Sequence, residues 1–224
     1  EISHVKEVAR LCDTAYPKFL EFLKPGRREF EVLADLEHWF RLEGVEGVYF
    51  LISTGADPEN KFQWIMDHKI ERGDSIRVTW EICYAGGYWG QLVRTLSLGP
   101  PSSEEQAAFD TILEAQQLGV REMRVGKTAL DVTKAIDDRI NKSGYRQGNH
   151  IGHGMGLDVT ERPILNLTDR SELKPGMVIE LHPHAIVKRN PPGGAAWVGD
   201  MYLVRDSGPE NLFETPKVFD NVFK

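Results

Sequence analysis

The chain has 224 residues, of which 41% are hydrophobic and 27% charged, enough for one domain with a substantial core. No apolar run approaches the roughly 20 residues that span a bilayer, so we expect a soluble, cytoplasmic protein with no membrane partner. The formal net charge of −7 argues against a nucleic-acid partner, which would need a basic face. Cys12 and Cys83 form no CxxC pair, which favours reduced thiols. The chain begins without methionine inside a helical pattern, so we expect it to be part of a longer or processed one.

The first half of the chain predicts two helices followed by three strands. Apolar residues recur at helical spacing until Pro25 and Gly26 end the first helix. Gly86 and Gly87 separate two β-type segments, which predicts a hairpin. The expected elements are helices at 5–23 and 28–42 and strands at 47–55, 75–85 and 88–99.

The second half repeats this order. Two capping boxes predict helix starts, because a Ser or Thr side chain and an acid or amide three residues later satisfy each other's backbone N–H groups. They pair Ser103 with Gln106 and Thr128 with Asp131. The expected elements are helices at 101–123 and 128–144 and strands at 176–187 and 195–208. We therefore predict a single α+β domain over residues 1–224, with two similar halves and a sheet backed by helices.

Four segments together carry a family resemblance. They are LKPG at 23–26, GGYWGQLVRTLSLGPPSSEEQ at 86–106, HIGHGMGLDVTERP at 150–163, and LKPGMVIELHPHAI at 173–186 followed by VGDMYLVRDSGPENL. In this order and spacing the chain resembles the catalytic domain of the creatinase, aminopeptidase P, prolidase and methionine aminopeptidase family (peptidase family M24). The resemblance implies the pita-bread fold, a curved antiparallel sheet backed by helices in two pseudo-symmetric halves. It also implies a homodimer and, in larger members, a separate N-terminal domain.

The family's peptidases hold two divalent metals and a bridging water with two aspartates, one histidine and two glutamates. The resemblance places these five positions at Trp80 (with Thr79 and Glu81 as neighbours if the register slips), Gln91, His153, His182 and Gly199. Two further histidine positions of the family fall near Phe62 and on Thr160. Only His153 is retained, so we expect no dinuclear metal, no cofactor and no peptidase chemistry of the family type.

Polar residues gather at the same positions. Because side chains alternate along a strand, Glu180, His182 and His184 are expected on one face. The resemblance turns that face toward the cavity, together with His153 and His150, and it predicts that Glu161 faces the cavity too. We expect the His153 and His182 rings to lie within about 7 Å on adjacent strands.

The leading hypothesis is a metal-independent, creatinase-like hydrolase that cleaves a C–N bond in a small molecule. His153 would act as general acid or base, because imidazole titrates near neutral pH, with His182 as its counterpart or an oxyanion donor. Glu161 and Glu81 would fix a tautomer or bind a cationic group. The expected substrate-binding residues are His150, His184, Glu180, Phe62, Trp89 and Gln91.

Other readings stay open. Elimination or decarboxylation could replace hydrolysis. A catalytically inactive binding module would have a shallow or filled cavity. A mononuclear metalloenzyme could use His153, His182 and a carboxylate such as Glu81, and an Xaa-Pro peptidase-like hydrolase is a further alternative.

Overall fold

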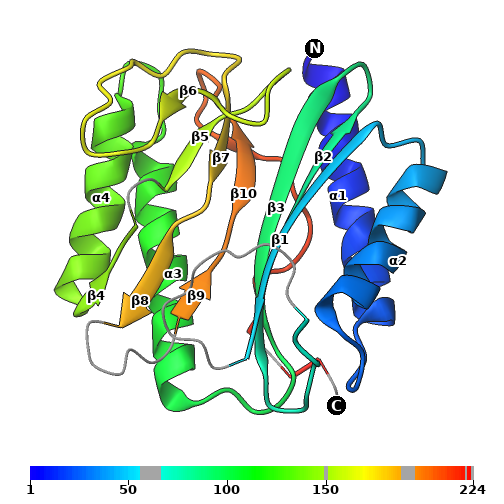
Figure 1. The fold of residues 1–224 in the computed structure, drawn as a ribbon. Coiled ribbons are helices and arrows are strands. Elements are labelled where there is room, and N and C mark those ends of the chain that lie inside the picture. Colours follow the sequence, from blue (N-terminus) through cyan, green and yellow to red (C-terminus); the bar gives the residue numbers. More distant parts are fainter. Residues whose placement is uncertain (56–66, 149–150, 188–194, 220, 223–224) are drawn as a thin grey trace.

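Two pairs of helices lie on the outside of the molecule, and the strands lie between them (Figure 1). The computed structural model describes residues 1–55, 67–148, 151–187, 195–219 and 221–222. The helices are α1 (Ile2–Phe22), α2 (Glu29–Leu42), α3 (Ser103–Glu122) and α4 (Ala129–Lys142). None of them is long and apolar enough to cross a membrane, within the part of the chain that the structure describes.

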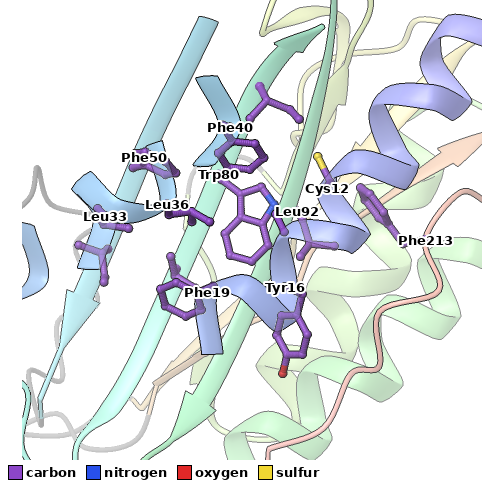
Figure 2. Close-up of a cluster of buried hydrophobic side chains, with 14 of the residues drawn as sticks. Cys12, Tyr16, Phe19, Leu33, Leu36, Phe40, Phe50, Trp80, Leu92 and Phe213 are labelled. Carbon is purple, nitrogen blue, oxygen red and sulfur yellow. The ribbon is translucent and has the colours of Figure 1, made fainter. Parts of the chain in front are cut away.

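The first half follows the predicted order. Helices α1 and α2 cover an antiparallel sheet of β1 (Gly47–Thr54), β2 (Ser75–Tyr84) and β3 (Tyr88–Ser97), in the order β1-β2-β3. Side chains alternate between its faces. Phe50, Trp80 and Leu92 stand side by side on the helix face, where Trp80 is fully buried with its ring 5.7 Å from that of Phe19 (Figure 2). The residues next to them in sequence therefore face the interior of the molecule.

The second half divides its strands between two sheets. One has the order β11-β10-β7-β5-β6 and the other β4-β8-β9, and their strand pairs are antiparallel. The bounds are β4 (Tyr145–Arg146), β5 (Gly152–Gly154), β6 (Glu161–Ile164), β7 (Val178–Leu181), β8 (His184–Val187), β9 (Ala195–Trp197), β10 (Asp200–Leu203) and β11 (Glu210–Asn211).

Two expectations for this half are corrected. The predicted strand at 176–187 is two strands, β7 and β8, because Pro183 between them has no N–H to continue a ladder. The predicted strand at 195–208 likewise divides into β9 and β10, on either side of Gly199.

One of the two predicted helix starts, that of α3, is displaced by one residue. The capping box of α3 is Ser102 with Glu105, rather than Ser103 with Gln106, because the Ser102 hydroxyl accepts the Glu105 N–H at 3.2 Å. The predicted box of Thr128 with Asp131 at α4 is confirmed.

The two halves meet where β3 passes the segment between β9 and β10. Val93 and Gly199 exchange backbone hydrogen bonds of 3.2 and 3.0 Å. Beside them Arg94 forms a buried ion pair with Asp200 at 2.8 Å and donates to the Gly199 carbonyl. Lys217 also binds Asp200 and reaches Gln116 of α3. A buried charged network thus ties the halves together behind their facing strands.

Candidate functional site

A cavity of about 760 Å³ lies between the two halves. Its walls come from the inner face of β1–β3 on one side and from β5, the β7–β8 segment and β9 on the other. The lining residues are Val48, Tyr49, Leu51, Glu81, Trp89, Gln91, Gly148, His153, Val159, Thr160, His182, His184 and Trp197. Aromatic and apolar side chains form most of the wall, and a few polar groups converge within it, as is typical of a small-molecule site.

His153 and His182 lie together in this cavity. His153 is on β5, and His182 directly follows the adjacent strand β7. Their ring centroids are 5.3 Å apart in an edge-to-face arrangement, and both side chains are buried. His153 Nδ1 lies 3.0 Å from the Gly154 carbonyl oxygen. A neutral ring that donates through Nδ1 keeps its lone pair on Nε2. The geometry agrees with the expected juxtaposition, and the roles of both residues stay predictions.

Trp197 packs against His182 and His184 in the cavity wall, and the sequence did not indicate it as a site residue. Its indole N–H donates to the His182 carbonyl at 2.7 Å, and its ring centroid lies 5.5 Å from those of His182 and His184. Its backbone N–H binds the Thr95 hydroxyl, which fixes it against β3. Counting two residues back from Gly199, an expected cavity position, would have pointed to it.

The hairpin positions require a correction. The expected ligand position at Trp80 faces the helices, and its neighbour Glu81 faces the cavity instead. Glu81 stands directly opposite Gln91 on β3 and Tyr49 on β1, and all three line the cavity. Burial raises the pKa of Glu81 to about 7, so this carboxyl titrates near neutrality.

Glu180 is also placed differently from the expectation. It is fully buried, and it is not among the residues that line the cavity. A Cβ added to Gly199 would lie 2.4 Å from Glu180 Oε1, so this carboxyl occupies the space beside that glycine. Neither of its oxygens has a hydrogen-bond partner among the described residues. Burial, and then the negative charge of Asp200, raise the pKa of Glu180 well above its usual value.

The prediction that Glu161 faces this cavity is wrong. Its carboxylate accepts the Asp158 N–H at 3.0 Å and closes the turn around Gly156. It lines a separate pocket of about 290 Å³. Thr160, the preceding residue, lines the main cavity instead.

The other expected substrate-binding residues divide into two groups. His184, Trp89 and Gln91 line the cavity as expected. His150 and Phe62 lie outside the described residues.

The donor set does not fit a dinuclear metal centre. Such a centre needs several carboxylates to balance its charge, whereas Gln91 and His182 are uncharged or cationic. Gly199 has no side chain, and Glu180, Val93 and His182 approach it within 2.4 to 2.8 Å of where a Cβ would lie, which leaves no room for one. Among the described residues no group of three or more His, Cys, Asp or Glu side chains is placed to hold a metal ion. This also removes support from the mononuclear alternative built on His153, His182 and Glu81.

Comparison with known proteins identifies the family. The model of metallopeptidase family M24 matches residues 3–206. An uncharacterized peptidase, YqhT, of Bacillus subtilis is 29% identical over 221 residues, which is 97% of this chain and 62% of that protein. The Xaa-Pro dipeptidase of Pyrococcus furiosus is 28% identical over 221 residues, with the same shares covered.

Solved structures agree in fold. An Xaa-Pro dipeptidase from Bacillus anthracis superposes with a TM-score of 0.91 at 29% identity, over 98% of this chain and 62% of that one. The prolidase from Pyrococcus horikoshii OT3 gives 0.90 at 26% identity, over 98% and 63%. The chain thus spans about three fifths of the length of these relatives, and the predicted pita-bread fold is confirmed. The chain belongs to metallopeptidase family M24.

Proposed function

We propose that this chain hydrolyses the amide C–N bond of a dipeptide-sized substrate, with His153 and His182 as its acid and base. The observation that carries the proposal is the pair of buried imidazoles, 5.3 Å apart, in a cavity of about 760 Å³. The relatives named Xaa-Pro dipeptidase support hydrolysis and make Xaa-Pro dipeptides the first substrates to test. A cavity of this volume also argues against a binding module with a filled site.

The reaction needs one group to take a proton and another to give one. His153 Nε2 takes a proton from water as the water oxygen bonds to the carbonyl carbon. His182, protonated, gives its proton to the nitrogen as the C–N bond breaks. The products are a carboxylic acid and an amine. The proton on His153 then returns to His182 through water, which restores both rings.

His153, the one retained ligand position, and the neighbouring cavity carboxyl of Glu81 do not suffice for a metal-dependent route. Gln91 and Gly199 offer no carboxylate, so we propose that the reaction proceeds without divalent metal. This departs from the metallopeptidases that share the fold.

The test is hydrolysis of Xaa-Pro dipeptides by tag-free protein before and after chelation, with elemental analysis of both samples. We expect the rate to survive chelation. An activity that disappears with chelator and returns with Mn²⁺ would refute the metal-independent chemistry and would favour the Xaa-Pro metallopeptidase alternative.

A further inference from the structure

Two side chains that line the cavity side by side, Glu81 and Gln91, carry acceptor oxygens that no donor of a described residue reaches. Glu81 and Gln91 are directly opposite one another on β2 and β3, and they are 4% and 3% exposed. No hydrogen bond or ion pair from a described residue reaches the Glu81 carboxylate, and burial accounts for its raised pKa. Gln91 Nε2 donates weakly to Thr79 at 3.4 Å, while its Oε1 has no partner in the described part of the chain.

Aromatic side chains stand on either side of these acceptors. Tyr49 is opposite Glu81 on β1, and Trp89 is two residues before Gln91 on β3, which places both on the same face. The Trp89 ring lies across Gly47, where an added Cβ would be 3.1 Å from it. The glycine therefore leaves room for the Trp89 indole in the cavity wall. Aromatic rings attract cations to their faces.

Among the described residues, the groups directly opposite Glu81 on the neighbouring strands add no positive charge. Tyr49 on β1 and Gln91 on β3 are neutral, and Glu180 of β7 interacts electrostatically with Glu81 as a second carboxyl. The histidines His153 and His182 lie in the opposite wall. A buried carboxylate and a buried carbonyl oxygen without donors are costly to leave unmatched, which favours a ligand that supplies several N–H groups.

We infer that Glu81 and Gln91 bind a cationic, N–H-rich group of the substrate, an amidinium, guanidinium or ammonium. The planar cations suit two adjacent acceptors best, because their parallel N–H groups can reach the Glu81 carboxylate and Gln91 Oε1 together. The inference rests on the proposed function for the reacting bond, since it places the charged end of the substrate opposite the histidine wall.

The probes are benzamidinium, benzamide and benzoate, which share one shape and carry charges of +1, 0 and −1. Binding to the wild-type chain is measured by calorimetry at pH 8. We expect benzamidinium to bind at least about tenfold more tightly than benzamide, since a hydrogen bond to a charged group is worth roughly 1.5–3 kcal/mol. Benzoate should bind more weakly than benzamide. Equal affinity for the first two probes, or tightest binding of benzoate, would overturn the inference.

Glu81→Gln keeps the shape and removes the charge, so it should abolish the preference for benzamidinium. Gln91→Met removes the side-chain amide, both its carbonyl acceptor and its weak donor to Thr79, and should weaken benzamidinium by several-fold while changing benzamide less. Glu7→Gln, an exposed change on α1, is the matched control and should leave all three affinities unchanged. A folded Glu81→Gln that still prefers the cation contradicts the assignment. If that variant does not fold, the wild-type series and Gln91→Met decide.

His153→Gln separates this inference from the proposed function. It should lose hydrolysis and keep the benzamidinium preference. If the preference is absent while hydrolysis still depends on His153, the cation site alone is wrong. If the preference is present while His153→Gln retains full activity, the proposed chemistry alone is wrong.

Discussion

A buried carboxyl with a raised pKa makes folding stability depend on pH, and Glu81 is such a group. Its pKa rises from 4.5 to about 7 on folding, so the folded state retains a proton that the unfolded state has lost. The stability that this group contributes is complete below pH 4.5 and is lost as the pH rises toward 7. The shift corresponds to about 3 kcal/mol, from roughly 1.4 kcal/mol per pKa unit.

Glu81→Gln cannot ionise and should therefore lack this loss. Urea denaturation at pH 4.5 should give similar stabilities for the two proteins. At pH 8 the variant should be more stable by up to about 3 kcal/mol. Glu180→Gln tests the same physics at a second site, since burial raises the pKa of Glu180 in the same direction. Parallel pH curves for wild type and Glu81→Gln would show that this carboxyl is not desolvated.

The histidine pair makes a separate prediction. His153→Gln and His182→Gln should each lower turnover by roughly two to four orders of magnitude, the usual size of general acid–base effects. The double variant should lose little more than either single one, because the two act as a unit. Turnover is measured under saturating substrate, and melting curves must show that each variant is folded. His38→Gln, on α2, is the control and should leave turnover unchanged.

At the scale of single residues the sequence predicted several residues that line the cavity, but not which carboxyls reach it. His153, His182, His184, Trp89 and Gln91 were all expected at the site, because they occupy positions fixed by neighbouring motifs. The first hairpin ligand position was placed on Trp80, one residue before Glu81, which was itself an expected site residue. The residue opposite Gln91 depends on strand register, and a spacing carried over by resemblance does not fix that register. The positions of two carboxyls were also missed.

The predictions for these two carboxyls, those of Glu180 and Glu161, failed for different reasons. Glu180 follows the expected alternation along its strand, but its carboxyl fills the space beside Gly199 and does not line the cavity. That space is formed by packing between distant segments, which the sequence does not display. The Glu161 carboxylate instead closes a turn in its own segment, where it accepts the Asp158 N–H. A local hydrogen bond of this kind competes with any role assigned by analogy.

At the scale of elements, close packing of α1 on β3 depends on Gly90. A Cβ added there would lie 2.5 Å from Val8 Cγ1, closer than real contacts allow. Gly90→Ala should therefore cost about 1–3 kcal/mol of stability, the usual range for overpacking. Val8→Ala removes the clashing methyl, so the double variant should be more stable than the sum of the single changes by about 0.5–3 kcal/mol. Denaturant titration of all four proteins measures this coupling, and strict additivity would contradict it.

The helices and the first three strands could be predicted because each has a local period and a local stop signal. The strands of the second half could not be bounded in the same way. Pro183 and Gly199 interrupt continuous apolar runs, and their effect depends on which sheet each part joins. Pairing between distant segments decides that, and a single sequence does not display it.

At the scale of the whole molecule, Asp200 joins both halves. It is buried, and although burial raises the pKa of its carboxyl, Arg94 and Lys217 hold that pKa below its usual value. Asp200→Ala would leave the buried Arg94 guanidinium uncompensated, which typically costs about 3–5 kcal/mol. Lys217→Met should cost less, because that side chain is partly exposed. Denaturation followed by tryptophan fluorescence and by circular dichroism compares the two, and equal losses would contradict the burial argument.

The division into two similar halves was predicted from the repeated order of elements and is seen in the paired helices of each half (Figure 1). The contact between the halves was not predictable. Arg94, Asp200 and Lys217 are separated by long stretches of chain, and nothing local marks them as partners.

Glu180 and Gly199 also constrain the order in which this chain could change. Any side chain introduced at residue 199 meets three atoms at once, Glu180 Oε1 at 2.4 Å, Val93 Cγ2 at 2.6 Å and His182 Cβ at 2.8 Å, so that substitution is penalised in the present surroundings. A mutational route toward a carboxylate at 199 must first shorten residue 180 and also move Val93 and His182 aside, and the reverse order passes through a destabilised intermediate. The two positions are therefore epistatic. A survey of related sequences should find a large residue at 180 and a side chain at 199 seldom together.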